Sequence, residues 1–215
     1  MSVTAINLAG DVSVCQQRIG CQAVGRWEPN SRGRLQEAAL TLFAERGFDQ
    51  TTAAQIAEAA GLTERTFFRH FTDKREVLFG GFEILGSQLI AAVTEAPEND
   101  GALDAVARGL DAAAAMLGAG RRDLARRRQS VIADNADLRE REFAKLAEYS
   151  AAVAAALGVR GVGEPQATMA ADAGMTILRV ALQKWSNDCD DGPDLSAVMH
   201  DSLAQWRAMT AEVRP

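Results

Sequence analysis

Apolar positions along this chain recur every three or four residues, which is the spacing of one face of an α-helix. Gly47 ends the first clear example, the segment 31–46. The same spacing predicts further helices over 53–60, 64–71, 74–95, 102–118, 121–133, 136–158, 166–187 and 194–213. No strand-like alternation of polar and apolar residues competes with these assignments. The pattern therefore predicts an all-α fold.

Three segments follow from the same pattern. Residues 1–28 contain glycines, weak periodicity and few charges, so we expect a flexible N-terminal arm. Residues 29–78, here called the head, are expected to form a three-helix domain, and residues 79–215, the body, a larger helical domain. Gly80 and Gly81 lie inside the expected helix 74–95, where each costs about 1 kcal/mol relative to alanine. Close packing against a neighbouring helix is one explanation, and easier bending between the domains is the other.

The head contains the start and stop signals of two short helices joined by a tight turn. Thr52 and Thr63 are good N-caps, because a threonine hydroxyl accepts a hydrogen bond from an otherwise unpaired amide. Gly61 stands where a helix commonly ends in a left-handed residue, a conformation that glycine adopts without steric cost. Two helices joined in this way form a helix-turn-helix, which can place its second helix in the major groove of DNA.

The second of these helices has one apolar and one polar face. Phe67 and Phe71 are four residues apart and would be buried together, which leaves polar side chains outside. An arginine there offers two parallel donors to guanine, and a threonine can hydrogen-bond or touch a thymine methyl group. The plainer interpretation is a solvated surface, and both threonine caps would form in a protein that never meets DNA.

These residues also resemble a known signature. The run Thr66, Phe67, Phe68, Arg69, His70 and Phe71, followed by Lys74, is similar to that of the TetR family of transcriptional regulators, and the similarity extends from about Arg32 to Leu78. The family usually has a tyrosine where this chain has Phe68, so one hydroxyl contact to a phosphate is missing. The resemblance implies phosphate contacts from Thr52, His70 and Lys74 and base contacts from Arg65, Thr66 and Glu64. The expected DNA-binding residues are Arg32, Arg34, Thr52, Thr63, Glu64, Arg65, Thr66, Phe68, Arg69, His70 and Lys74.

The net charge of −6 is unusual for a DNA-binding protein, because neutralisation of phosphates supplies much of the affinity. Positive and negative charges balance over residues 26–80, and residues 81–215 carry the whole excess of acid. An acidic body would discourage loose binding to DNA and leave a small arginine-bearing face to dock.

The sequence gives little support to several other classes of protein. We expect a cytoplasmic protein without a membrane partner, because no apolar run of about 18 residues and no secretory signal is present. Cys15, Cys21 and Cys189 form no close metal-ligand cluster, so reduced thiols are expected; a Cys15–Cys21 redox switch is the alternative. We expect no metal and no cofactor. Two histidines, without a paired-histidine motif, a phosphate-binding glycine loop or a nucleophile elbow, do not favour an enzyme.

A homodimer is expected, because two recognition helices are needed to reach two half-sites of an operator. The family resemblance implies an interface built from the last two helices. Its expected residues are Met175, Leu178, Leu182, Trp185, Val198, Leu203, Trp206 and Met209. The alternative for these positions is the core of a single chain.

Members of the family typically bind a small molecule in the second domain. The expected lining of such a pocket is Phe82, Leu85, Leu89, Met116, Leu117, Phe143, Leu146, Met169 and Ile177, although ordinary core packing explains the same residues. A nearby run of arginines consists of Arg121, Arg122, Arg126, Arg127 and Arg128. It is either a solvated face paired with acids or a site for a phosphate or carboxylate whose tail enters the pocket. The run and the sequence after it resemble a subgroup of the family that binds fatty acyl thioesters, which suggests an acyl-CoA or another lipid-like effector.

Together these features predict a repressor whose dimer occupies a near-palindromic operator and which a small hydrophobic effector releases. Two alternatives stay open: a DNA-binding protein without an effector, and an all-α enzyme. The first alternative predicts a filled second domain, whereas a sensor needs an enclosed cavity.

Overall fold

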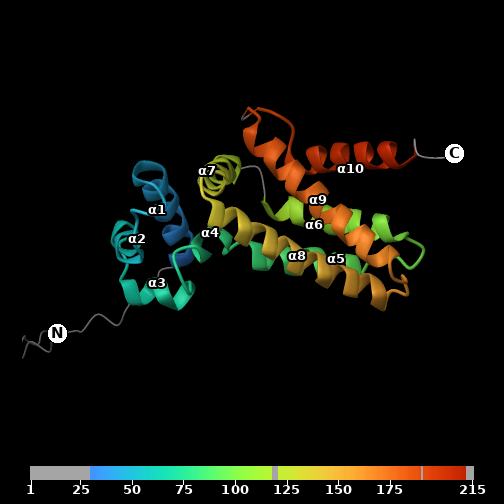
Figure 1. The fold of residues 1–215 in the computed structure, drawn as a ribbon, viewed down its shortest axis with the longest axis horizontal. Coiled ribbons are helices and arrows are strands. Elements are labelled where there is room, and N and C mark those ends of the chain that lie inside the picture. The colour runs from blue at the N-terminus through green and yellow to red at the C-terminus, as the bar shows by residue number, and fades with distance from the viewer. Residues whose placement is uncertain (1–29, 118–120, 190, 212–215) are drawn as a thin grey trace, which may run out of the picture.

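The computed structural model describes residues 30–117, 121–189 and 191–211, and no strand occurs among them. The expected arm 1–28, with Cys15 and Cys21, lies outside the described residues. The helices are α1 (Ser31–Arg46), α2 (Ala53–Ala59), α3 (Glu64–His70), α4 (Glu76–Phe79), α5 (Phe82–Thr94), α6 (Ala102–Leu117), α7 (Arg122–Ala133), α8 (Ala136–Val159), α9 (Gln166–Asn187) and α10 (Leu195–Ala211). The expected all-α fold is confirmed, with the helix-turn-helix at one end of the molecule and the larger helical body at the other (Figure 1).

The caps of α2 and α3 form as the sequence predicts. The Thr52 hydroxyl accepts from the Gln55 amide at 3.2 Å, and the Gln55 side chain accepts from the Thr52 amide at 2.9 Å. Thr63 accepts from the amide of Thr66 at 3.2 Å. Gly61 between the helices has a φ of +65°, in the region that favours glycine. Local hydrogen bonds therefore fix where the second helix begins.

The expected long helix 74–95 is wrong, because the chain breaks between α4 and α5. A Cβ on Gly80 would lie 2.8 Å from the ring of Phe71 and 2.9 Å from the guanidinium of Arg32. Arg32 also donates to the Gly80 carbonyl oxygen at 2.6 Å. This side chain occupies a carbonyl that an uninterrupted helix would use for its own hydrogen bond, so contacts from α1 hold the break.

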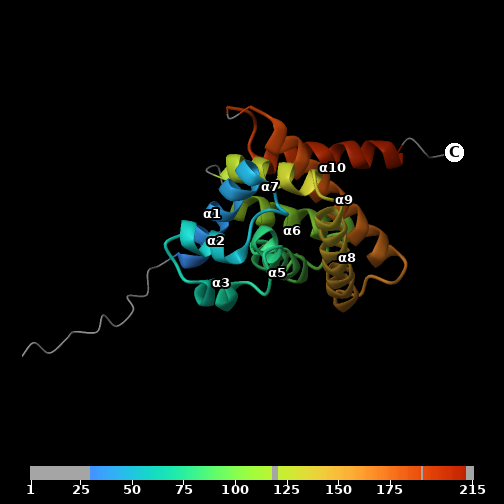
Figure 2. The same ribbon diagram turned by 60° about the vertical axis from the view of Figure 1, so that its left-hand side comes forward.

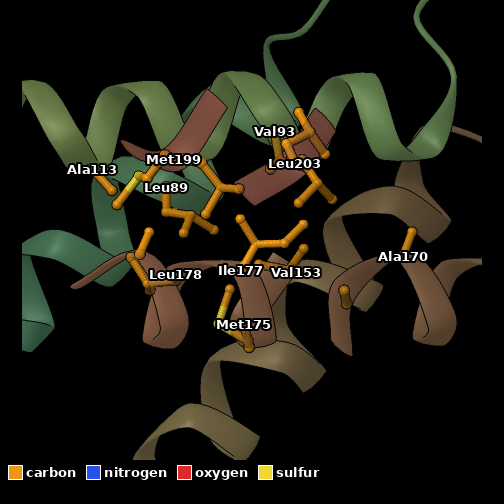
Figure 3. Close-up of a cluster of buried hydrophobic side chains, with 14 of the residues drawn as sticks. Leu89, Val93, Ala113, Val153, Ala170, Met175, Ile177, Leu178, Met199 and Leu203 are labelled. Carbon is orange, nitrogen blue, oxygen red and sulfur yellow. The ribbon is translucent and has the colours of Figure 1, made fainter. Parts of the chain in front are cut away.

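The body has its own apolar core. Helix α5 packs along α6 and α8, and α9 packs against α6, α8 and α10. Figure 3 shows Leu89 and Val93 from α5, Val153 from α8, Ile177 from α9 and Leu203 from α10 gathered around one centre. All five are buried. Burial of side chains from four helices explains why the body is helical throughout its described length.

The apolar core of the head includes residues from the body. Val131 and Ile132 of α7 and Leu138 of α8 belong to the same buried cluster as Leu35 of α1 and Phe79 of α4. Helix α7 lies against α1 (Figure 2). The turn between α7 and α8 therefore closes the head's core.

A buried arginine strengthens this junction. Arg128 of α7 donates from Nε to the Leu78 carbonyl oxygen at 2.7 Å and pairs through Nη1 with Glu142 of α8 at 3.0 Å. Its guanidinium lies 4.5 Å from the centre of the Phe82 ring. Both charged side chains are only 14% exposed. Burial lowers the pKa of Arg128 and Glu142 opposes that shift, so the group remains a cation in an apolar surround.

More ion pairs connect head and body. Arg127 of α7 donates to Glu37 of α1 at 2.6 Å, a hydrogen bond that raises the pKa of Arg127. Glu76 of α4 pairs with Lys145 of α8 at 3.4 Å and also with Arg141. Solvent screens the pair of Arg127 with Glu37, because Glu37 is 57% exposed, whereas Glu76 and Lys145 are only 14% and 16% exposed.

The arginine run has a structural role that was not expected. Arg122 is buried, donates to the Gly192 carbonyl oxygen at 3.1 Å and lies 5.2 Å from the centre of the Trp185 ring. Arg126 donates from Nε to the Ser186 carbonyl oxygen at 2.9 Å. The last carbonyls of a helix lack partners within it, and Arg126 supplies a donor to one of them at the end of α9, whereas Arg122 binds the loop that follows. The interpretation of the run as a solvated face paired with acids is therefore wrong for the buried Arg122, while Arg126 is 39% exposed and also pairs with Asp123.

Most of the expected dimer interface is core of a single chain. Buried residues of that set are Met175, Leu178, Leu182, Trp185, Val198 and Leu203. Trp206 is half-buried and Met209 is exposed. Helical spacing identifies an apolar face but not the surface that covers it, and here neighbouring helices of the same chain cover it.

One described segment, Glu76–Thr94, is long and apolar enough to cross a membrane when length and composition are the only criteria. This differs from the expectation that the chain has no apolar run of that length. Leu85, Leu89 and Val93 in this segment belong to the body's core. Burial in that core accounts for its composition.

The two glycines at the break between α4 and α5 make a matched pair. We expect Gly80→Ala to lower the free energy of unfolding by about 1–3 kcal/mol, because its methyl group meets Phe71 and Arg32. Gly81→Ala meets nothing within 4 Å and should be neutral or stabilising by up to about 1 kcal/mol. Chemical denaturation of both variants measures the difference, and equal effects would contradict the packing explanation.

Candidate nucleic-acid interface

Helix α3 is held by the apolar side chains on its inner face. Phe67 is fully buried and Phe71 almost so, with their ring centres 5.5 Å apart. They join Ile56 of α2 and Leu35 of α1 in the core of the head. Because these contacts fix the rotation of α3 about its axis, they also determine which side chains face solvent.

Two arginines dominate the outer face of α3. Arg65 and Arg69 are exposed and form no hydrogen bond or ion pair with the part of the chain that the structure describes. Glu64 in the first turn is also exposed, and Thr66 is half-buried with its hydroxyl 3.0 Å from that of Thr63. The helix therefore presents two uncommitted guanidinium groups, which suit guanine edges or phosphates.

Phe68 and His70 have different environments on the same helix. Phe68 is 52% exposed, and its ring lies edge-on to that of Phe67 with the ring centres 5.3 Å apart. Burial, followed by the nearby charges of Arg69 and Arg32, lowers the pKa of His70. The imidazole is therefore neutral at neutral pH, so it could reach a phosphate as a hydrogen-bond donor but not as a cation.

The structure shows three of the expected DNA-binding residues in contacts within the chain. Lys74 donates to the carbonyl oxygens of Phe48 at 2.8 Å and Thr51 at 3.1 Å, and its ammonium lies 4.3 Å from the centre of the Phe48 ring. Arg34 donates to the carbonyl oxygen of Ala60, where α2 ends. Arg32 is used at the break after α4, as described above. These side chains position the two DNA-reading helices by satisfying carbonyls at chain turns.

An apolar cavity lies between head and body. Its volume is about 130 Å³, and its lining comes from α1, α4, α5, α6, α7 and α9 together with Gly81. Four of the nine expected pocket residues line it: Phe82, Leu85, Met116 and Leu117. Leu89, Leu146 and Ile177 are instead buried in the body's core. Phe143 is 59% exposed and Met169 is 61% exposed, so these two face away from any interior.

The head side of this cavity was not foreseen from the sequence. Gln36 and Leu40 of α1 and Val77 and Leu78 of α4 line it, beside Arg128 of α7. The apolar spacing of α1 pointed to these positions only as head core. No signal in the sequence showed that the body would pack against them.

The described residues contain no group of three or more histidines, cysteines, aspartates or glutamates close enough to hold a metal ion. Cys189 is an exposed free thiol. Neither observation indicates a metal site or a reactive thiol at the DNA-reading face or in the cavity.

The family comparison falls on the DNA-reading region. Residues 35–79 match the family model described as "Bacterial regulatory proteins, tetR family". The regulator TcmR of Streptomyces glaucescens is 38% identical over 76 residues, which cover 35% of this chain and 34% of that protein. The matches to curated relatives thus span only about a third of their length or less.

Solved structures extend the likeness to most of the chain. A TetR-family regulator from Syntrophomonas wolfei is 16% identical and has a TM-score of 0.56, with 86% of this chain and 96% of that one covered. FadR from Bacillus subtilis, solved in complex with stearoyl-CoA, is 22% identical and has a TM-score of 0.54, with 80% and 95% covered. At such identities the likeness shows the fold. The sequence match thus assigns residues 35–79 to the TetR family of bacterial regulatory proteins, and the solved structures show that most of the chain shares the fold of such regulators.

Proposed function

We propose that the protein is a transcriptional repressor that reads a near-palindromic operator with α3 and is released by a small apolar molecule. The observation that carries the DNA-binding part is the outer face of α3, where Arg65 and Arg69 are exposed and uncommitted while Phe67 and Phe71 anchor the helix from behind. An arginine with no internal partner loses no ion pair when it meets a base or a phosphate.

The charge distribution supports a restricted interface. Three cationic side chains of the head each donate a hydrogen bond to a backbone carbonyl oxygen: Arg32, Arg34 and Lys74. Fewer free cations mean fewer phosphates neutralised, so affinity should depend on salt less steeply than in a strongly basic protein. Base contacts would then supply a large share of the preference for one sequence.

A homodimer remains part of the proposal, with a corrected interface. The exposed apolar side chains on the last two helices are Met169 and Val180 of α9 and Met209 of α10, together with the half-buried Trp206. They lie on the outside of the helices whose inner faces form the core. A second copy that covers these outer faces would place two recognition helices on one operator.

The effector part rests on the cavity between head and body, because an effector-independent DNA-binding protein has no need of one. The stearoyl-CoA in the Bacillus subtilis structure makes an acyl-CoA one candidate among apolar effectors. Whatever its identity, the effector must bind the released conformation more tightly than the DNA-bound one, because equal affinity for both shifts nothing.

Replacement of the free arginines should remove sequence preference. Duplexes are first selected from a random pool with the wild-type chain, and fluorescence anisotropy then compares the selected duplex with a scrambled one. Arg65→Ala and Arg69→Ala should each reduce the preference by roughly tenfold or more, the usual value of a bidentate base contact. Arg139→Ala, an exposed arginine on α8, is the control and should leave it unchanged. Undiminished preference in both α3 variants would contradict the proposal.

The phenylalanine in the position usually held by tyrosine offers a gain-of-function test. Phe68→Tyr adds a hydroxyl to an exposed ring on α3, and a new hydrogen bond to a phosphate should tighten operator binding by roughly fivefold. Phe143→Tyr, an equally exposed ring on α8, should have no effect. Weaker binding by Phe68→Tyr in the anisotropy titration would mean that the bare ring itself is the contact.

The oligomeric state tests the corrected interface. Val180→Glu places a charge on the outer face of α9, where burial against a second copy would leave it unpaired. Sedimentation velocity should show a dimer for the wild type and mostly monomer for this variant. Phe143→Glu on α8 should remain dimeric, and dissociation of that control alone would place the interface elsewhere.

A further inference from the structure

The cavity between head and body is built from both of them. Leu40 of α1 and Leu78 of α4 line one side, and Leu85 of α5 and Leu182 of α9 line the other. Helix α7 contributes Leu124, Ala125, Arg128 and Gln129 to the same lining, and Arg121 precedes it directly. Since Arg121 is exposed, the cavity reaches the surface where α7 begins.

Its lining combines an apolar wall with positive charge. Most of the lining side chains are aliphatic or aromatic, the polar ones are Gln36 and Gln129, and the charged ones are Arg121 and Arg128. No acidic residue lines the cavity, although the whole protein carries a net charge of −6. Because arginines are the only charged residues in the lining, the cavity favours a ligand that has an apolar part and an anionic group.

Both arginines retain donors for such a group. Arg121 makes no hydrogen bond or ion pair with any described residue. Arg128 uses Nε and Nη1, but its Nη2 is covered by protein and has no acceptor among the described residues. A buried donor without an acceptor is costly, so an acceptor brought by a ligand would stabilise this arrangement. A carboxylate matches the paired donors of a guanidinium.

The size of the cavity limits the apolar part of the ligand. A volume of about 130 Å³ is close to the roughly 150 Å³ of a dry apolar cavity that holds one benzene molecule. A ring or chain of about six carbon atoms therefore fits, whereas a long acyl chain does not.

We propose that this junction cavity binds an apolar monocarboxylate of about the size of benzoate or hexanoate, with its tail between Leu40, Leu85 and Leu182 and its carboxylate at Arg121 and Arg128. The assignment deepens the proposed function by naming the effector's class and place. The effect of the carboxylate on transcription rests on the proposed repressor function. The binding of the carboxylate to the cavity does not depend on that function.

A ligand in this position contacts the head and the body at once. Leu78 of α4 lines the cavity, and its carbonyl oxygen accepts the hydrogen bond from Arg128 Nε. A carboxylate that accepts from Nη2 leaves that hydrogen bond in place and adds a contact to α7. Binding therefore stabilises the present arrangement of α4 and α7 and disfavours any other position of the head, and of α3, relative to the body.

The test measures binding to the full-length chain without DNA. Ligand-observed NMR titrations use benzoate and hexanoate, their uncharged counterparts benzamide and hexanamide, and hexanoyl-CoA. We expect saturable binding of both carboxylates and at least roughly fivefold weaker binding of the amides, because a charge-assisted hydrogen bond is lost. Equal affinity of acid and amide would overturn the proposal, and so would binding of hexanoyl-CoA alone.

Two variants and a control locate the site. Arg121→Gln changes an exposed side chain and should weaken carboxylate binding by at least roughly threefold without altering amide binding. Ala125→Leu should fill the cavity and remove binding of all probes. Arg139→Gln removes the same charge from α8 outside the lining and should bind like the wild type. Unchanged carboxylate affinity in Arg121→Gln would overturn the assignment even if Ala125→Leu failed to fold.

The outcome separates the site from the proposed function. If the wild-type chain binds DNA but neither carboxylate, the site is wrong and the DNA-binding function stands. If it binds benzoate but no duplex from the random pool, the site stands and the repressor function is wrong.

Discussion

The head depends on the body to close its apolar core. Three short helices of about fifty residues bury little surface on their own, and the cluster around Leu35 and Phe79 is completed by Val131, Ile132 and Leu138 from the turn between α7 and α8. The position of the DNA-reading helix therefore follows from the position of that turn. Any event that moves α7 changes the surface on which α1 and α4 are packed.

The polar contacts of α7 show why this helix can transmit such a change. Arg122 donates to the loop after α9 and Arg126 to the last turn of α9. Arg127 pairs with Glu37 of α1, and Arg128 donates to the Leu78 carbonyl oxygen within α4. One helix is thus bonded to both domains through side chains only a few residues apart. The cavity adjoins the same helix, so ligand, body and head share a single set of contacts. Coupling between sites needs such a shared element with more than one arrangement.

The sequence predicted the features that local chemistry decides. The caps at Thr52 and Thr63, the left-handed Gly61 and the buried face of α3 depend on neighbours a few residues away, and all are present. The break after Phe79 was missed because Arg32, 48 residues earlier, holds it. Lys74 was expected to face DNA because nothing in the sequence shows that the carbonyls of the loop between α1 and α2 accept its hydrogen bonds. Residues such as Leu178 were assigned to an interface because helical spacing does not distinguish one covering surface from another.

We expect the head to open only together with the α7–α8 turn. Native-state hydrogen exchange on the full-length chain measures this most directly, because it gives an opening free energy for each protected amide. The shared core predicts that amides of α1 near Leu35 and Phe43 and amides of α7 near Val131 open with the same free energy. Opening of the α1 amides at a markedly lower free energy than those of α7 would show an independent head and contradict the account.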